Sequence, residues 1–319
     1  MRLLLTAIGK RVQLIKHLRE SNYVVGVDAG NLSPARYFVD SFFNVPLCSD
    51  KDYINALLGI CVKEKIDMLI SLYEKEFLIL DEYRDEFKKI GTILLLSDRY
   101  ILEICNDKWN THNFFIKNDI NTPKTCSVEE VKANFNLYIR YPVIIKPRDG
   151  MGSRGMFYAD NRDELFYIIQ DLENYIIQEK IEGTEFTLDI LCDLGGQVIS
   201  IVPRQRLEVR AGEISKGRSV KDPRLINAAL DLINKMNSGD NAKAIGPMNI
   251  QCIVDNTDEI KFIEINPRFG GGVPLTFESG VDYGKIFDHM VSGKKIQPII
   301  GEFEELIMLR FDDAVYFKP

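Results

Sequence analysis

The first hundred residues alternate continuous apolar runs with segments of helical periodicity. An apolar run without polar interruptions is typical of a strand that is buried on both faces of a sheet. Apolar residues at helical spacing follow the first run, and a charged segment at Glu74–Lys89 predicts a second helix. Strands joined by crossover helices indicate a parallel open sheet, which binds ligands beyond the carboxyl ends of its strands. The expected strands are Leu3–Ile8, Tyr23–Val27, Asp67–Leu72 and Gly91–Leu96.

The pattern changes after residue 97, where one helix is expected over Asp98–Asn118 and short strands separated by turns follow. This mixture indicates an α+β arrangement, so the fold class is α/β and α+β. The chain is divided into residues 1–97, 98–175 and 176–319. The later elements are expected at Val143–Lys146, Arg162–Leu172 (helix), Ile176–Glu179, Thr184–Cys192, Val198–Val202, Asp222–Lys235 (helix), Asn249–Asp255, Ile260–Asn266 and near Leu306–Phe311.

Candidate chemistry is clearest in residues 261–272, KFIEINPRFGGG. Glu264 and Asn266 are two positions apart on an expected strand, so both side chains point to the same face. Carboxylate and amide oxygens suit Mg²⁺ that carries nucleotide phosphates, and Arg268 offers a planar fork for an anion. The turn before this strand can bring Gln251 of the preceding strand beside Glu264. Taken alone, the segment fits a solvated edge strand equally well.

A glycine-rich segment, KPRDGMGSRGM at 146–156, directly follows an expected strand. Its glycines leave few side chains, so backbone N–H groups can fold over phosphate oxygens. Lys146, at the end of the strand, can reach the same phosphates as a point charge. A flexible hairpin loop is the simpler interpretation, but the lysine favours a nucleotide site. The candidate nucleotide-binding residues here are Lys146, Gly150, Gly152 and Ser153.

A strand, a bend and a second strand are expected over residues 176–191. Adenine is usually held by a hinge between two lobes, where backbone groups read its edge. Gln178, the Glu179 carbonyl and the Ile181 amide are placed for this role, and Glu185 can accept hydrogen bonds from ribose hydroxyls. An ordinary surface hairpin is the alternative, and it explains this segment better when the segment is taken alone.

Basic residues crowd the stretch 203–217, PRQRLEVRAGEISKG. One interpretation is a solvated strand and loop in which Glu208 and Glu213 are the local counter-ions. The other is a clamp for a transferred phosphate together with a substrate carboxylate. Both interpretations stay open at this point. The basic residues are Arg204, Arg206, Arg210 and Lys216.

Composition narrows the class of protein. The net charge of −7 argues against a nucleic-acid partner, which would require a basic face. The six cysteines lie far apart without a C-x-x-C pair, which is typical of thiols in a reducing compartment. No stretch reaches the roughly 18 apolar residues of a membrane span, and Gly9-Lys10-Arg11 interrupts the first apolar run too early for a signal peptide. We therefore expect a soluble, cytoplasmic protein without a membrane partner.

In this order the motifs resemble the ATP-grasp superfamily, particularly its carbamoyl-phosphate-synthase-like members and small carboxylate–amine ligases. The likeness covers nearly the whole chain. It implies a pre-ATP-grasp α/β domain in residues 1–97, a small lobe or lid with its leading helix in 98–175, and a large lobe with the metal site in 176–319. Asn106-Asp107-Lys108, with the later Thr122-Pro123, is similar to the family's entry helix, where a lysine reaches the nucleotide phosphates, so Lys108 joins the nucleotide-binding candidates.

The resemblance also implies the cofactors, ATP with two Mg²⁺ ions, for which Mn²⁺ is a substitute. Gln251, Glu264 and Asn266 are then the metal ligands, and Arg268 is the arginine that contacts phosphate or substrate. There are two departures from the family pattern. Gln178 stands where several members carry glutamate, and Gln251 replaces a common carboxylate.

The implied reaction is ATP-dependent ligation. A small carboxylate, including an amino acid, is activated as an acyl phosphate and joined to an amine, giving ADP and phosphate. The candidate catalytic residues are Arg268, Lys216 and Arg210; Arg210 and Arg268 also hint at a second carboxylate on the substrate. The expected partners are these small molecules, and a homodimer is compatible with them.

Three alternatives remain. Within the same fold, a carbamoyl-phosphate-synthase-like reaction phosphorylates a small acid or carbamate without ligation. A dinucleotide-dependent enzyme built on the first lobe is disfavoured because the G-x-G-x-x-G fingerprint is missing. A non-catalytic nucleotide-binding protein would not need both the metal and the lysine positions.

Overall fold

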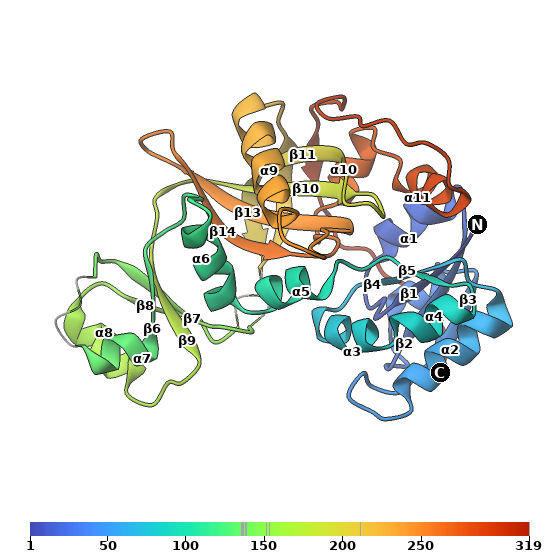
Figure 1. Ribbon diagram of the computed structural model, residues 1–319, viewed down its shortest axis with the longest axis horizontal. Coiled ribbons are helices and arrows are strands. Elements are labelled where there is room, and N and C mark those ends of the chain that lie inside the picture. Colours follow the sequence, from blue (N-terminus) through green and yellow to red (C-terminus); the bar gives the residue numbers. More distant parts are fainter. Residues whose placement is uncertain (135–136, 138, 151, 153, 211, 319) are drawn as a thin grey trace.

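The computed structural model describes residues 1–134, 137, 139–150, 152, 154–210 and 212–318 and contains three sheets (Figure 1). The sheets follow one another along the chain. A parallel sheet at the N-terminus is followed by a four-stranded sheet at the opposite end of the molecule and by a six-stranded sheet between them. The predicted fold class is confirmed.

The N-terminal lobe is a five-stranded parallel sheet of order β3-β2-β1-β4-β5. Leu3 and Leu5 of β1 pack in one apolar cluster with Ile15 of α1, whereas Leu4 packs in another cluster with Leu57 of α2. The alternation along β1 therefore covers both faces of the sheet. The strands are β1 (Arg2–Thr6), β2 (Tyr23–Asp28), β3 (Ser41–Asn44), β4 (Met68–Ser71) and β5 (Ile93–Leu94); the helices are α1 (Val12–Arg19), η1 (Pro34–Tyr37), α2 (Tyr53–Glu64), η2 (Glu74–Glu76), α3 (Phe77–Glu82) and α4 (Arg84–Lys89).

Two expectations for this lobe need correction. The helix predicted over Glu74–Lys89 is divided into η2, α3 and α4, and Tyr83 between the last two does not have helical backbone angles. The strand predicted over Gly91–Leu96 pairs only at Ile93–Leu94. Its remaining leucines are buried, so the apolar run reflects burial more than sheet pairing.

The small lobe is an antiparallel four-stranded sheet of order β6-β9-β7-β8, with α7 and α8 on one face (Figure 1). Ser127 and Glu130 form a capping box that starts α7. The strand that opens the predicted third segment at residue 176 belongs to this sheet, because β9 pairs with both β6 and β7. The elements are β6 (Thr125–Ser127), α7 (Val128–Ala133), β7 (Val143–Pro147), β8 (Phe157–Ala159), α8 (Arg162–Ile169) and β9 (Tyr175–Glu179).

The large lobe is a six-stranded antiparallel sheet of order β14-β13-β10-β11-β12-β15. The predicted hairpin of its last two long strands is present, with Gln251 opposite Glu264. β11 continues to Arg210, beyond the predicted end at Val202, because its polar half still pairs with β12. The elements are β10 (Gly183–Cys192), β11 (Val198–Arg210), β12 (Glu213–Ser219), α9 (Pro223–Met236), β13 (Gly246–Asp255), β14 (Ile260–Asn266), α10 (Pro274–Glu278), α11 (Tyr283–Ser292) and β15 (Ile307–Leu309).

The connection between the lobes is two helices, α5 (Arg99–Asn106) and α6 (Lys108–Lys117), where a single helix was predicted. Asp107 has extended backbone angles and its carboxylate accepts a hydrogen bond from the Trp109 amide, which caps α6. Both helices contact β14, and Phe115 of α6 stacks at an angle on Phe262. The helices therefore pack against the large lobe as they lead into the small one.

No helix in the described part of the chain has the length and apolar character needed to cross a membrane. The six cysteines carry free thiols, and three of them are buried.

Candidate functional site

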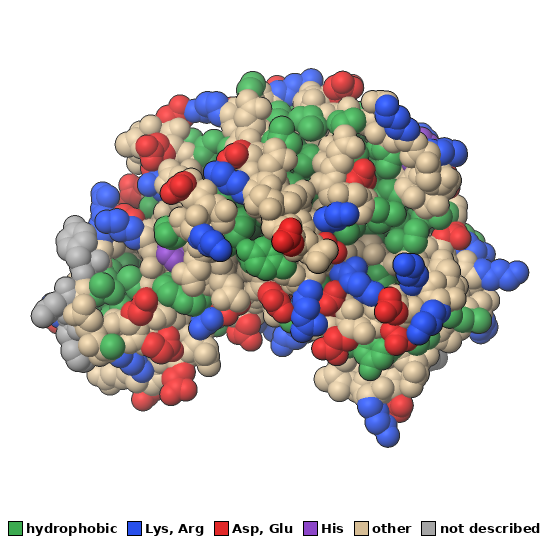
Figure 2. Space-filling view, in the orientation of Figure 1, with side chains coloured by type: hydrophobic (Ala, Val, Ile, Leu, Met, Phe, Trp, Pro, Cys, Tyr) green, Lys and Arg blue, Asp and Glu red, His purple; other side chains and the backbone are tan. Residues whose placement is uncertain are grey.

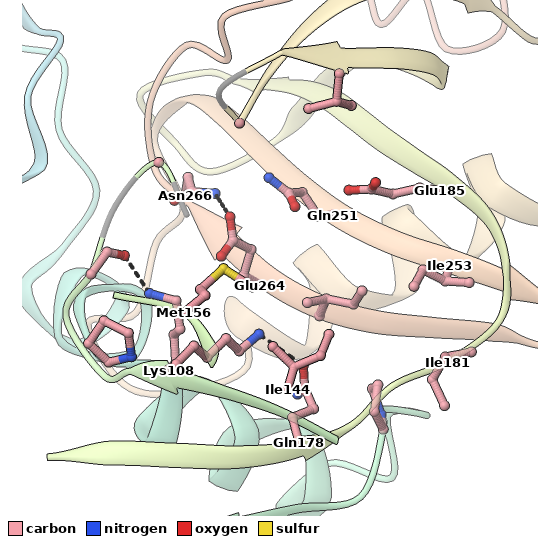
Figure 3. A pocket seen from close by; sticks show the side chains of 18 of the residues that line it. Lys108, Ile144, Met156, Gln178, Ile181, Glu185, Gln251, Ile253, Glu264 and Asn266 are labelled. Atoms are coloured by element: carbon pink, nitrogen blue, oxygen red, sulfur yellow. Dashed lines mark hydrogen bonds between the residues drawn. The ribbon is translucent and has the colours of Figure 1, made fainter. Parts of the chain in front are cut away.

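A cavity of about 350 Å³ lies between the four-stranded and six-stranded sheets. Both lobes contribute to it, and strands β7 and β9 face strands β13 and β14 across it (Figure 3). From outside, a hollow separates the small lobe from the N-terminal lobe, and charged side chains of both signs line its rim (Figure 2). The cavity residues predicted from sequence are Lys108, Lys146, Gly150, Gly152, Gln178, Glu179, Ile181, Glu185, Gln251, Glu264, Asn266 and Arg268.

Strand register brings the three candidate metal ligands together. Gln251 of β13 pairs directly with Glu264 of β14, and Asn266 is two positions farther on the same face. The Asn266 side-chain amide donates to the Glu264 carboxylate at 2.9 Å, and the three side chains point into the cavity (Figure 3). They supply one carboxylate and two amide groups.

This donor set fits a metal ion that arrives with its own anionic partner. No three His, Cys, Asp or Glu side chains gather as a metal site among the residues that the structure describes. One carboxylate and two amide oxygens would hold Mg²⁺ weakly without further charge. Nucleotide phosphates would supply both the missing charge and the missing oxygen ligands.

Lys108 lines the cavity because Asp107 interrupts the helix and a new helix, α6, begins at Lys108. The Asp107 carboxylate that caps α6 also pairs with Arg148, just beyond β7. The Lys108 amide donates to the Arg148 carbonyl at 3.0 Å, and its ammonium donates to the Gly150 carbonyl at 2.6 Å. Lys108 is therefore tied to the glycine-rich segment at both ends.

Lys146 is buried at the end of β7, with 6% of its surface exposed. Its ammonium donates to the Gln178 side-chain oxygen at 2.9 Å, and the Gln178 amide nitrogen donates to the Thr125 hydroxyl at 3.0 Å. Burial, opposed by the Glu264 charge and reinforced by Lys108, lowers the pKa of Lys146 to about 8. In this structure the Gln178 oxygen, predicted to accept a hydrogen bond from adenine, accepts one from Lys146.

The charge of Glu264 is set by its neighbours. Burial is the largest single effect and works to raise the pKa of Glu264. The charges of Lys108 and Lys146, with the Asn266 hydrogen bond and the Arg268 charge, together outweigh burial and hold the pKa below its usual value. Glu264 is therefore an anion at neutral pH. An anionic carboxylate near two lysine ammonium groups can hold a metal ion while the lysines bind phosphates.

The candidate hinge lies at the junction of β9 and β10. Glu179 and Ile181 line the cavity beside apolar side chains of both lobes (Figure 3). Glu185 forms an ion pair with Arg206 at 3.0 Å. Burial raises the pKa of Glu185, although Arg206 opposes the rise. This arrangement places a carboxylate at one side of an apolar part of the cavity.

The glycine-rich segment contains backbone that side chains would strain. Gly152 and Gly155 have φ angles of 62° and 71°, in the left-handed region that favours glycine. Gly212, in the β11–β12 turn, approaches the Gly152 backbone so closely that a Cβ there would lie 3.3 Å from it. Ser153, also predicted to bind nucleotide, lies outside the described residues.

The three predicted catalytic residues are not brought together. Arg268 lines the cavity and forms an ion pair of 2.7 Å with Glu74 of the N-terminal lobe. Arg210 and Lys216 both pair with Glu208, and neither is among the described residues that line the cavity. In this structure Glu208 is their counter-ion, as the solvated-strand interpretation expects.

The sequence grouped Arg206 with three other basic residues, as a phosphate clamp or as a solvated strand, and did not single it out as a cavity residue. Arg206 lies on β11 two positions from the fully buried Arg204, and it pairs with Glu185 on the neighbouring strand β10. Simple strand alternation places Arg206 and Arg210 on the same face. The structure has register shifts between them, and these could not be read from the sequence. The other cavity residues that were not predicted are Pro123, Ile144, Pro147, Arg154, Met156, Val209, Gly212, Ile253 and Ile263.

A second cavity of about 250 Å³ adjoins the first on the side of the N-terminal lobe. Lys108, Gly150, Glu264 and Asn266 line both cavities. The second cavity therefore opens beside the candidate metal ligands. Its remaining lining residues are Glu74, Lys75, Leu78, Cys105, Asn106, Thr111, Asp149 and Ile265.

A buried polar network supports the loop that follows β14. Asp189 accepts hydrogen bonds from Arg204 at 2.6 and 2.9 Å and from Asn249 at 2.9 Å. A Cβ at Gly270 would lie 2.1 Å from the Asn249 amide nitrogen, and one at Gly272 would lie 2.2 Å from an Arg204 nitrogen. The loop backbone therefore rests directly on the network, and only glycine fits at both positions.

Comparison with known families agrees with this arrangement. A model of the ATP-grasp domain matches residues 105–272, which is just over half of the chain and includes both walls of the first cavity. The chain belongs to the ATP-grasp family. A model of the PylC-like N-terminal domain matches residues 3–95, the lobe that contains the parallel sheet.

Curated relatives include ligases and synthases. The chain is 29% identical over 213 residues to a D-alanine–D-alanine ligase of Fusobacterium nucleatum, covering 62% of this chain and 71% of the ligase. It is 27% identical over 189 residues to the carbamoyl phosphate synthase large chain of Acidobacterium capsulatum, covering 55% of this chain and 17% of the synthase. The chain thus spans about a fifth of the length of such a synthase.

Solved structures support the same fold. The N5-carboxyaminoimidazole synthetase of Staphylococcus aureus superimposes with a TM-score of 0.72 at 17% identity, covering 97% of this chain and 79% of that protein. The L-amino acid ligase of Bacillus licheniformis superimposes with a TM-score of 0.67 at 18% identity, covering 93% of this chain and 77% of that protein.

Proposed function

We propose that this protein is an ATP-dependent ligase that activates a small carboxylate as an acyl phosphate and joins it to an amine, releasing ADP and phosphate. The observation that carries this proposal is the convergence of Lys108, Lys146 and Glu264 on one cavity between the two lobes. Two ammonium groups and one carboxylate with amide neighbours match the needs of a metal-bound triphosphate.

The nucleotide would lie between the lobes with its base toward the hinge. The apolar side chains of Ile144, Met156 and Ile253 would enclose adenine, and the backbone at Glu179 and Ile181 would read its edge. Glu185, oriented by Arg206, would accept hydrogen bonds from the ribose. Lys108 and Lys146 would then meet the phosphates as point charges.

Glu264, Asn266 and Gln251 would hold Mg²⁺, or Mn²⁺ in its place. A bound divalent ion supplies charge neutralisation for the phosphoryl group during transfer. The lysines hold the phosphates in line with the acid, and Arg268 neutralises charge on the acid or the transferred group. Because phosphoryl transfer needs mainly positioning and charge, no protein nucleophile is required.

The reaction balances without another reagent. A carboxylate oxygen of the acid attacks the γ-phosphorus, and the bond from that phosphorus to the β-phosphate oxygen breaks to release ADP. The amine nitrogen then attacks the acyl carbon, and phosphate leaves as the amide forms and the amine loses a proton.

A panel assay tests the proposal. ADP release is measured with Mg²⁺–ATP across amino acids and small carboxylic acids, each with and without an amine such as a second amino acid. Ligation predicts ADP release that requires both substrates, with an amide product detected by mass spectrometry. The proposal is wrong if no acid raises ADP release above the rate with ATP alone.

The second candidate is phosphorylation of a small acid or carbamate without ligation. It is supported by the similarity to carbamoyl phosphate synthase large chains. Hydroxylamine separates the two reactions, because it traps an acyl phosphate as a hydroxamate. ADP release and hydroxamate formation at full rate without any amine would favour phosphorylation alone.

A further inference from the structure

Three arginines from distant parts of the chain lie around the loop that follows β14. Arg11 follows β1, Arg268 follows β14 and Arg310 follows β15. Burial is the main cause that lowers the pKa of Arg11; the charges of Arg268 and Arg310 lower it further, and those of Glu213 and Glu74 oppose the change. Like charges repel each other, so an anion bound among these arginines would relieve part of the repulsion.

Two carboxylates neutralise part of this positive charge. Glu74 pairs with Arg268 at 2.7 Å, whereas Glu213 lies 3.4 Å from Arg310 and 3.5 Å from Lys10. Within the described ranges, the Arg11 guanidinium has no ion pair and no hydrogen-bond partner. A guanidinium carries five donors, and this half-buried one uses none of them on a protein acceptor among the described residues. The charges of Glu213 and Glu74 act on Arg11, but neither carboxylate forms an ion pair with it, so its donors are left to bind an anion.

The position of Arg11 connects it to the proposed acid site. It lies beyond the carboxyl end of β1, where open parallel sheets bind ligands. A Cβ built on Gly271 would lie 3.4 Å from an Arg11 nitrogen and 3.4 Å from the Glu213 carboxyl carbon. The loop after β14 thus passes Arg11 without a side chain, three residues after Arg268.

We propose that Arg11 and Arg310 form a subsite for a second anionic group, a carboxylate or a phosphate, carried by the acid substrate. This inference rests on the proposed function, because it concerns the acid that would be activated beside Arg268 and Glu264. The acid therefore has two anionic groups. One is activated at the metal end of the cavity, and the other is held by the planar forks of the two arginines.

Matched pairs of acids test the subsite. ADP release is measured at saturating Mg²⁺–ATP with aspartate against asparagine, succinate against its monomethyl ester, and O-phosphoserine against serine. The variants are Arg11→Gln, which keeps a polar side chain and removes the charge, and Arg310→Gln as a second removal. Lys16→Ala is the matched control, because it removes one positive charge from the exposed face of α1.

The wild-type protein should prefer the member of a pair with the additional anionic group. Arg11→Gln should raise the KM of that member by ~10–100-fold, the range expected for a charge-assisted hydrogen bond. The KM of the other member and the affinity for ATP should stay unchanged, as should all values in Lys16→Ala. Preference in the aspartate and succinate pairs would identify a carboxylate, and preference in the phosphoserine pair a phosphate.

Two results would overturn the inference while leaving the proposed function intact. These are acid-dependent ADP release without preference within any pair, and a preference that both arginine variants retain. If no acid promotes ADP release, the proposed function fails instead. Calorimetric titration of the same acids into wild type and Arg11→Gln, each with Mg²⁺–ADP, then decides whether the anion subsite exists. Binding that depends on Arg11 supports the subsite, and equal binding or none rejects it.

Discussion

At the scale of single residues, Lys146 couples burial to charge. Its ammonium is enclosed between the sheets and bonded to Gln178, and its pKa falls from 10.5 to about 8. The cation is therefore lost as the pH rises through about 8 in the folded protein. In the unfolded chain, lysine keeps its proton to higher pH, so between these values the unfolded state binds more protons. Lys146 should therefore contribute stability that increases with pH in this window.

The same shift predicts how nucleotide affinity changes with pH. We expect ATP affinity to fall by up to about tenfold for each pH unit above 8, because the phosphates need the cation. Lys146→Arg should remove this dependence, since a guanidinium stays charged at these pH values. The measurement is calorimetric ATP binding between pH 7 and pH 9.5. A slope that is the same in wild type and in the arginine variant would contradict the proposed role of Lys146.

Glu264 gives a second prediction at this scale. Glu264→Gln keeps the size of the side chain but removes its charge, which two lysines stabilise as an anion. We expect ADP release to fall by at least about a hundredfold, because charge stabilisation by a metal contributes several kcal/mol. Glu259→Gln, exposed in the turn of the same hairpin, is the control. Turnover within a few-fold of wild type in Glu264→Gln would exclude Glu264 as a metal ligand.

At the scale of elements, the start of α6 determines where Lys108 lies. Asp107 caps the helix and pairs with Arg148 at the end of β7. Asp107→Ala should lower the free energy of unfolding by about 1–2 kcal/mol through loss of the cap, and it should also weaken ATP binding because Lys108 is released. Urea unfolding and calorimetry measure the two effects.

The matched control is Asp222→Ala, because Asp222 caps α9 in the same way by accepting from the Arg224 amide. It should lower stability by a similar amount without changing ATP affinity. If both variants weaken ATP binding equally, the effect comes from stability and the proposed placement of Lys108 is wrong.

Much of the element order could be predicted, and the failures have physical causes. Continuous apolar runs identify β1 and β4 because both faces of a parallel sheet are covered. The break at Asp107 was missed because the periodicity of apolar residues continues through it. α10 and β12 carry no local signal as strong, and their positions depend on packing against distant segments. α11 was not predicted, although Asp282 caps its start and Gly293 follows its end.

At the scale of the whole molecule, the N-terminal lobe contributes directly to the site. Glu74 of this lobe orients Arg268 of the large lobe, and the two positions are 194 residues apart in the sequence. Glu74→Gln should lower kcat by roughly tenfold, in line with the loss of a charged hydrogen bond, and leave ATP affinity unchanged.

Steady-state ADP release and calorimetric ATP binding distinguish these effects. Glu103→Gln, which removes an exposed carboxylate paired with Arg99 on α5, is the control and should change neither value. A rise in the dissociation constant of ATP in Glu74→Gln would mean that this ion pair supports the lobes and not the acid site.

The sequence by itself determined which residues share a strand face and in what order the motifs occur. Gln251, Glu264 and Asn266 could be grouped because strand alternation and one short turn fix their relation locally. Only the tertiary structure decided which charges meet. It brought Arg206 to Glu185, and it left Arg210 and Lys216 with Glu208. It also set Arg11 and Arg310 near Arg268, since contacts between distant segments depend on how whole lobes pack and not on any local pattern.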